Sequence, residues 1–358
     1  MKIALLAEQL RQEVPGGIGT YVRGLLGGLR DLGALGPEVE IVASRGPRPD
    51  PLGALAEQMG MTLHATALPH RLQMQLWDRG IGTLGAGCDV VHRTSLAGPA
   101  RSPRPSTVLI HDLAWRAEPS LTTPRGRRWH EAALDRAIAS SAVLLTPSSQ
   151  VADALEAAGV APSRIHVVGE GADHLPQPDR ERTGACLAEA GVEGPFFLSV
   201  STLEPRKNLA GLLTAYRQAE SSLPLVVVGP KGWGEEITPV EGVHLVGAQP
   251  AEILAGLYEQ CAGFCYVPWL EGFGLPPLEA AHHGAPLIVS TEVPSIVGLE
   301  GNWSVAPGDT AGITEALRAV GEGGEAVESA RAHARTFAAQ HRWVDSARRH
   351  VEIWEHLS

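Results

Sequence analysis

The stretch GFCYVPWLEGFGLPPLEAAHHGAPLIVST, residues 263–291, holds an apolar run, a glycine-bearing turn, a helix-like segment and a second apolar run. A parallel β-α-β unit has this order of elements. Pro276 or Pro277 suits the first turn of a helix, because the N–H that proline lacks has no partner there. The stretch therefore predicts two parallel strands joined by a helix.

The same pattern recurs along the chain, since short apolar runs ending in Gly, His or Asp are each followed by a helix-like segment. In the first half these runs are KIALLA, VEIVAS, VVHRTS, TVLIHD and AVLLTPS. In the second half they are FFLSVS, LVVVGP, VHLVGA, GFCYVP and PLIVST. Five runs in each half predict an α/β protein with two doubly wound, Rossmann-like domains.

A chain of 358 residues exceeds the usual size of one hydrophobic core, which also favours two domains. The polar, proline-containing stretch 171–184 predicts the linker. We expect domains at 1–178 and 179–340, and a C-terminal helix at 341–358 that crosses back to the first domain. Its apolar side chains at helical spacing are Trp343, Ala347, Val351 and Trp354.

The charge is uneven, because residues 1–180 carry 18 basic and 18 acidic side chains and the remainder carries 11 and 22. The net charge of −11 thus lies in the second half and argues against a nucleic-acid partner. The start, MKIALLAEQL, fits neither a signal peptide nor a membrane span, so we expect a cytoplasmic protein. The four cysteines show no metal-site spacing and are expected to be free thiols; no metal or cofactor is expected.

Ligands of open parallel sheets bind outside the carboxyl ends of the strands, so the loops there are the candidate sites. The segment EGFGLPPLE, residues 271–279, is the strongest candidate. Its glycines leave backbone amides at a helix N-terminus, where the helix dipole favours a diphosphate. Glu271 suits sugar hydroxyls and Glu279 the two hydroxyls of a ribose. The alternatives are an exposed turn carboxylate for Glu271 and a first-turn helix carboxylate for Glu279.

Three further loops qualify. In LEPRKN, residues 203–208, the neighbouring cations Arg206 and Lys207 suit a diphosphate, and the alternative is a solvated basic pair with Asn208 as a helix cap. In PGGIG, residues 15–19, Gly17 lets backbone amides approach a phosphate or a sugar, although a plain turn is the commoner reading. In TVLIHD, His111 either faces a ligand or is a core histidine paired with Asp112.

Taken together, these segments resemble the retaining glycosyltransferase family 4, which has the GT-B fold of two facing Rossmann-like domains. EGFGLPPLE resembles its E-x7-E element. GGIGTYV, IHDLAW, LTPSS, VVGEGAD, LEPRKN, VVVGP and the late tryptophan-bearing helix follow in the family's order. The LEPRKN variant is similar to bacterial mannosyl- and rhamnosyltransferases of surface polysaccharide assembly.

The resemblance implies metal-independent transfer of a hexose, with GDP-mannose as a candidate donor, to a hydroxyl of a glycan or lipid-linked acceptor. It assigns His111 and Glu271 to the transferred sugar. It assigns the nucleotide-sugar site to Gly17, Arg206, Lys207, Gly272, Phe273, Gly274, Leu275 and Glu279. Arg206 takes on a further role because the chain has Thr202 where many members carry arginine.

Two enzyme alternatives share the fold, a sugar-nucleotide epimerase and an inverting transferase, but neither needs both glutamates. A two-domain ligand-binding protein is the alternative from another class. Residues 93–136 contain eight arginines and four acids. This region is either a solvated face or a peripheral contact with an anionic membrane that presents a lipid-linked acceptor.

Overall fold

The computed structural model describes residues 1–99, 101–230 and 240–358, and they form two compact units. Unit 1 comprises Met1–Gly171 and Arg342–Ser358, and unit 2 comprises Ala172–His341. The chain thus passes between the units twice. These two passages are adjacent, because the N–H of Ala172 donates to the carbonyl of His341 over 3.0 Å.

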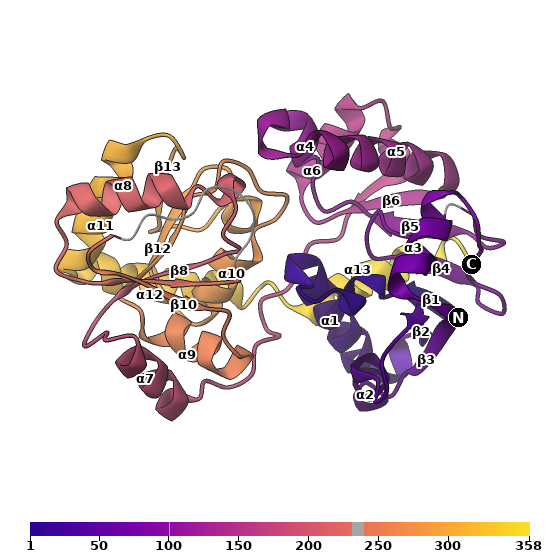
Figure 1. Ribbon diagram of the computed structural model, residues 1–358, viewed down its shortest axis with the longest axis horizontal. Helices are drawn as coiled ribbons and strands as arrows, with labels where there is room; N and C mark the ends of the chain where they lie inside the picture. The colour runs from indigo at the N-terminus through magenta and orange to yellow at the C-terminus, as the bar shows by residue number, and fades with distance from the viewer. Residues whose placement is uncertain (100, 231–239) are drawn as a thin grey trace. The chain divides into compact units, whose positions relative to one another are not determined.

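Unit 1 is built on one parallel sheet with the strand order β3-β2-β1-β4-β5-β6-β7 (Figure 1). Its strands are β1 Lys2–Leu6, β2 Glu38–Arg45, β3 Thr62–Pro69, β4 Val90–Arg93, β5 Ser106–Leu109, β6 Val143–Thr146 and β7 Ile165–Val167. Its helices are α1 Gly16–Asp31, α2 Pro51–Gln58, α3 His70–Asp78, α4 Ala114–Ala117, α5 Pro124–Ser140, α6 Ser149–Ala157 and α13 Trp343–Glu355. In register, Ile3 of the central strand β1 lies opposite Val39 and Val90.

Unit 2 is also built on one parallel sheet, with the order β10-β9-β8-β11-β12-β13. Its strands are β8 Phe197–Val200, β9 Leu225–Val228, β10 Val243–Gly247, β11 Gly263–Tyr266, β12 Leu287–Ser290 and β13 Trp303–Val305. Its helices are α7 Arg180–Glu189, α8 Leu209–Ala219, α9 Ala251–Gln260, α10 Leu275–His282, α11 Thr310–Glu322 and α12 Glu325–Ala338. In register, Phe197 lies opposite Leu225 and Gly263.

The central strands carry the cores because helices cover both faces of each sheet. In unit 2, Leu198, Val226 and Phe264 face one apolar cluster, whereas Phe197 and Val227 face the other. All ten apolar runs become strands, and the predicted fold class is confirmed. Three of the four cysteines, at 88, 261 and 265, are buried free thiols, and Cys186 is free and partly exposed.

The C-terminal helix α13 belongs to unit 1, where it packs beside α1 (Figure 1). All four side chains of its predicted apolar stripe, from Trp343 to Trp354, are buried. Two glycines of α1 make room for it. A Cβ atom on Gly24 would lie 2.1 Å from the Trp343 ring, and one on Gly28 would lie 2.3 Å from the Trp343 carbonyl oxygen. Glycine at both positions therefore permits the close contact.

Candidate active site

The order of strands reverses between β8 and β11 in unit 2, and the loops that follow these two strands carry the strongest sequence motifs. Ligands of doubly wound sheets bind at the carboxyl ends of the strands at such a reversal. The loop after β8 contains residues 201–208, and the loop after β11 contains residues 267–274. The two loops are joined, because the N–H of Trp269 donates to the Arg206 carbonyl over 3.0 Å.

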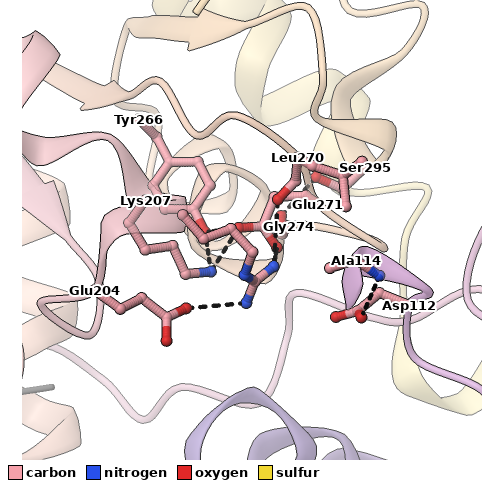
Figure 2. A network of polar contacts seen from close by, with 10 residues as sticks. Asp112, Ala114, Glu204, Lys207, Tyr266, Leu270, Glu271, Gly274 and Ser295 are labelled. Carbon is pink, nitrogen blue, oxygen red and sulfur yellow. Dashed lines mark hydrogen bonds and ion pairs between the residues drawn. The ribbon is translucent and has the colours of Figure 1, made fainter. Parts of the chain in front are cut away.

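Lys207, Tyr266 and Glu271 form a compact triangle of hydrogen bonds, which Figure 2 shows. The Lys207 ammonium lies 2.5 Å from Glu271 Oε1 and donates to the Tyr266 hydroxyl over 3.0 Å. The Tyr266 hydroxyl in turn donates to the same carboxylate oxygen over 2.8 Å. These two contacts use two of the three ammonium hydrogens of Lys207, so the third is available to a ligand as far as the described residues are concerned.

Arg206 completes the cluster from the same loop. Its Nη1 lies 3.3 Å from Glu271 Oε2 and donates to the Leu270 carbonyl over 3.2 Å, and its Nη2 lies 3.1 Å from Glu204 Oε1. The side chains of Arg206 and Lys207 are only 20% and 13% exposed. The alternative of a solvated basic pair is therefore wrong, because both cations are held against carboxylates.

Glu271 is the most enclosed of the charged side chains in the cluster, since its side chain is 8% exposed. Burial disfavours the charged carboxylate, but the Lys207 and Arg206 cations outweigh this effect and lower the pKa of Glu271. The alternative of an exposed turn carboxylate is thus also wrong. Burial and the Glu271 charge raise the pKa of Tyr266 well above its ordinary value, so its hydroxyl remains a proton donor.

Asn208 ends this loop as the N-cap residue of α8, in the left-handed conformation with φ 54°. Its side chain makes no capping hydrogen bond. Instead, the amide nitrogen donates to the Val267 carbonyl over 2.9 Å and to the Pro307 carbonyl over 2.8 Å. Asn208 is thus the N-cap residue, as the sequence suggested, but its side chain ties the β8 loop to the segments after β11 and β13 instead of capping the helix.

The N-terminus of α10 lies directly after this cluster. Gly274 is its N-cap residue, with φ 91° in the left-handed region that favours glycine, and Leu275 is the first helical residue. Ser295, after β12, holds two carbonyls of the turn: its N–H donates to Phe273 and its hydroxyl to Gly274, over 2.9 and 2.6 Å. Because C=O and N–H point in opposite directions in a trans peptide, the amides of Gly274 and Leu275 point away from Ser295.

Glu279 lies beyond the first turn of α10, which contains no acidic residue, so the alternative of a first-turn carboxylate is wrong. The residue is 6% exposed. Its Oε2 accepts from the Tyr258 hydroxyl over 2.9 Å, and its Oε1 lies 3.2 Å from His174 Nε2. Two separate segments thus fix the carboxylate, and each of its oxygens retains capacity for another hydrogen bond.

Gly17 and His111 belong to unit 1. The helix α1 already begins at Gly16, so Gly17 lies within its first turn rather than before it. No atom lies within 4 Å of the position that a Cβ of Gly17 would take, among the residues that the structure describes. The prediction of an accessible helix N-terminus is therefore consistent with the geometry, although the helix starts earlier than expected.

His111 follows β5 and is fixed at one ring nitrogen. Its Nε2 lies 2.8 Å from the Thr94 carbonyl, which can only accept, so Nε2 carries the proton. Burial lowers the pKa of His111, which favours the neutral ring. Nδ1 lies 4.0 Å from Glu170 Oε1, and the edge of Tyr21 packs on the ring with centroids 5.2 Å apart. Asp112 accepts from the Ala114 amide.

Several partners in these networks were not anticipated from the sequence. They are Glu204, Tyr258, Tyr266, His174 and Ser295. Glu204 stands inside the LEPRKN segment, and a buried tyrosine at the end of an apolar run was the available signal for Tyr266. The others come from segments whose proximity only the fold creates.

Both halves of the chain match known family models. Residues 15–174 match the model described as Glycosyltransferase Family 4, and residues 189–337 match the model described as Glycosyl transferases group 1. The chain is a family 4-like glycosyltransferase. The second match spans the β8 and β11 loops, so the polar cluster lies within the glycosyltransferase group 1 segment.

Curated relatives of this glycosyltransferase include the O-antigen chain mannosyltransferase B of Escherichia coli, 36% identical over 29% of this chain and 31% of that protein. The MMP alpha-(1->4)-mannosyltransferase of Mycolicibacterium hassiacum is 26% identical over 88% of both chains. Serotype-specific mannosyltransferase WbdA of E. coli also matches, at 30% identity over 20% of its length. The chain thus spans less than a third of the length of the first curated relatives that it matches.

Solved structures confirm the fold of this family 4-like chain. HepE of Anabaena, crystallised with UDP and glucose, has a TM-score of 0.75 at 16% identity over the full length of both chains. WaaG, a glycosyltransferase involved in lipopolysaccharide biosynthesis, has a TM-score of 0.67 at 14% identity and covers 98% of this chain and 99% of its own. The two Rossmann-like domains are those of the GT-B architecture.

The arginine-rich region 93–136 is less uniform than the sequence suggested. Arg93 is buried on β4 and donates to the hydroxyls of Ser140 and Ser141, so it is not part of a surface face. Arg116 and Arg136 lie against Glu131 and Asp78. The exposed arginines are 101, 104, 116, 125, 127 and 128. No helix in the described ranges is long and apolar enough to cross a bilayer.

Proposed function

We propose that the chain transfers a hexose from a nucleotide-diphosphate sugar to a hydroxyl of a glycan or lipid-linked acceptor, with retention of anomeric configuration and without a metal. One observation carries this proposal. Two nearly buried cations and the first amides of α10 meet at the strand reversal of unit 2, where a diphosphate can be bound through N–H groups alone.

Among the described residues, the cluster holds two carboxylates against two cations, so their formal charges balance before the ligand arrives. Lys207 and Arg206 balance Glu271 and Glu204. A diphosphate therefore binds through directed hydrogen bonds from Lys207, Arg206 and the Gly274 and Leu275 amides rather than through an excess of positive charge. The paired carboxylates keep both cations in place in the absence of ligand.

Glu271 contacts the transferred sugar in this proposal. A carboxylate has about four lone-pair positions. Lys207, Tyr266 and Arg206 occupy three of them, two at Oε1 and one at Oε2. The remaining position at Oε2 accepts one sugar hydroxyl.

The other site residues take the rest of the donor. Glu279 holds the ribose, and the amides of residues 272–275 line the diphosphate. In unit 1, His111 contacts the sugar and Gly17 the donor phosphates.

The chemistry that follows is electrostatic. As the glycosidic bond breaks, negative charge develops on the nucleotide diphosphate, and Lys207, Arg206 and the α10 amides are placed to stabilise it. The acceptor hydroxyl attacks from the face that the diphosphate leaves, and a phosphate oxygen of the leaving group takes its proton. This step requires no protein base.

Mannose is the first candidate sugar, because the curated relatives described above are named as mannosyltransferases. The nucleotide is a separate question, since the HepE structures contain UDP. A thermal-shift panel of GDP, UDP, TDP and ADP tests the nucleotide: one of the four is expected to raise the melting temperature selectively. NMR of the product from the matching sugar nucleotide then shows whether the anomeric configuration is retained.

Lys207→Ala and Glu279→Ala both remove the nucleotide-dependent shift in this account, while the variants still fold. Lys207 contributes a charge-assisted hydrogen bond, so its loss weakens nucleotide binding by roughly 10- to 100-fold. The matched control is Lys2→Ala, which removes an exposed lysine paired with Glu38 and Glu40. Unchanged nucleotide binding in both site variants would refute the proposed donor site.

A further inference from the structure

A second polar cluster lies in unit 1, and the proposed roles above do not use it. Its centre is Glu8, which follows β1 and is 1% exposed. Glu8 Oε2 accepts from the Ser44 N–H over 2.7 Å, and Oε1 accepts from the Ser44 hydroxyl over 2.6 Å. The Nδ1 atom of His70 lies 2.5 Å from Oε1. A buried carboxylate thus orients a histidine.

The hydrogen-bond pattern fixes the proton of His70. Glu8 Oε1 accepts from it, so Nδ1 carries the hydrogen. On the other side of the ring, Nε2 lies 3.0 Å from the side-chain nitrogen of Gln12, which can only donate. Nε2 is therefore the acceptor. The pair presents an unprotonated imidazole nitrogen whose only partner, among the described residues, is an exposed glutamine side chain.

The location of this cluster is that of a ligand site. Glu8, Ser44 and His70 stand at the carboxyl ends of β1, β2 and β3, which are neighbours in the sheet. The carboxyl ends of parallel strands are where doubly wound domains bind ligands. Glu8 is enclosed, but the His70 side chain is 23% exposed, so the oriented ring reaches the surface at this edge.

Packing alone does not explain a buried carboxylate at this position. Removing an ion from water is costly, and an apolar side chain of similar volume often stabilises a protein as well. Ser44 alone could be held by a neutral partner. A carboxylate behind an imidazole instead fixes the tautomer and increases the ability of the exposed nitrogen to accept a hydrogen bond.

We propose that the Glu8–His70 pair is a hydroxyl-binding subsite for the acceptor saccharide, an inference that rests on the proposed glycosyl transfer. A sugar hydroxyl donates to His70 Nε2 and displaces Gln12. The negative charge of Glu8 disfavours an anionic ligand here. The subsite therefore differs in ligand preference from the proposed phosphate-binding loops of unit 2.

The probe is methyl α-D-mannopyranoside, whose binding is followed by saturation-transfer NMR with the full chain. His70→Phe is expected to weaken its binding about tenfold or more, because the ring keeps its volume but loses the accepting nitrogen. His64→Phe is the matched control on β3: the His64 side chain is 64% exposed and lies outside the cluster, so sugar binding stays unchanged. Nucleotide-dependent thermal shifts are measured on the same samples.

The outcomes separate the two proposals. Loss of sugar binding in His70→Phe with an unchanged nucleotide shift supports the subsite. Equal sugar binding by the wild type and His70→Phe overturns it, as does the absence of binding of methyl mannoside, glucoside and rhamnoside to the wild type. A missing nucleotide shift in the wild type counts against the transferase function alone. If His70→Phe does not fold, Gln12→Ala decides, because this variant removes the group that the sugar must displace: tighter sugar binding supports the subsite, and equal or lost binding overturns it.

Discussion

Lys207 and Glu271 are 64 positions apart in the sequence, yet their charged atoms lie 2.5 Å apart. The sequence could predict that both residues gather at the carboxyl edge of one sheet, because each follows an apolar run. It could not predict that they pair, since the contact depends on how two loops approach each other. The same reason explains why the partners of Glu279 and the Glu8–His70 pair were missed.

A buried network in unit 1 depends on neutral histidines. His350 Nδ1 lies 2.8 Å from the Ser346 carbonyl and must donate, so Nε2 accepts from the Tyr21 hydroxyl over 2.9 Å. The Tyr21 oxygen then accepts from His92 Nε2 over 3.0 Å, and His92 Nδ1 accepts from the Thr107 hydroxyl. Protonation of either histidine would take away the nitrogen that accepts from a buried hydroxyl, Tyr21 for His350 and Thr107 for His92.

This arrangement predicts a loss of stability in acid. Burial lowers the pKa of His350 from 6.5 to about 4, so the unfolded chain binds a proton over this range while the folded chain does not. The free energy of unfolding therefore falls as the pH drops from about 6.5 to about 4, by up to roughly 3 kcal/mol from this residue. Urea titrations at several pH values measure how steeply the free energy of unfolding falls with pH.

His350→Gln provides the comparison, because its carbonyl can accept from Tyr21 but does not titrate. We expect this variant to lose stability less steeply between pH 6.5 and pH 4 than the wild type. A slope identical to that of the wild type would show that the His350 proton does not contribute, and that other groups account for the acid sensitivity.

At the scale of elements, all of the central strands were predicted, but three of the four edge strands of the two described sheets were not. The runs from KIALLA to PLIVST are apolar because helices cover both sides of them. The strands β3, β7 and β13 were missed, and each lies at or beside a sheet edge where exposed polar residues weaken the apolar pattern. The edge strand β10 was nevertheless predicted from VHLVGA, so the pattern detected apolar runs rather than the position of a strand in the sheet.

The contact between α1 and α13 depends on glycine residues in α1, which have no side chain to keep the two helices apart. Gly24→Ala is expected to destabilise the protein by about 1–3 kcal/mol, because a methyl group would overlap the Trp343 ring and force α13 outward. Gly27→Ala is the matched control on the same helix: nothing described lies within 4 Å of its Cβ position. Alanine there should stabilise α1 by about 0.5–1 kcal/mol.

Chemical denaturation of the two glycine variants measures both effects. A lower free energy of unfolding for Gly24→Ala and a higher one for Gly27→Ala, each relative to the wild type, support close docking of α13 on α1. Equal stabilisation of both variants would mean that the Trp343 ring does not lie against Gly24 in solution.

Helix α5 carries the second prediction at this scale. Arg125, Arg127 and Arg128 are exposed near its start. We propose that they attract an anionic membrane that holds a lipid-linked acceptor. Replacing all three with glutamine should reduce cosedimentation with phosphatidylglycerol vesicles but not with phosphatidylcholine vesicles. Equal binding of the wild type and the triple variant to anionic vesicles would refute this role.

At the scale of the whole molecule, the acidic second half contains the cationic cluster, which the sequence predicted from two adjacent residues in one loop. The structure adds that Glu204 and Glu271 balance these charges. The chain also passes between the units twice. The two connecting segments lie side by side, and the second leads into α13.

The central claim is that the loops after β8 and β11 hold the diphosphate of a nucleotide sugar. A crystal structure of the chain with the nucleotide diphosphate that the thermal-shift panel selects tests this claim most directly. The account predicts phosphate oxygens within hydrogen-bonding distance of Lys207 Nζ and of the Gly274 or Leu275 amide. Phosphates bound elsewhere, with the Lys207–Glu271–Tyr266 triangle untouched, would contradict it.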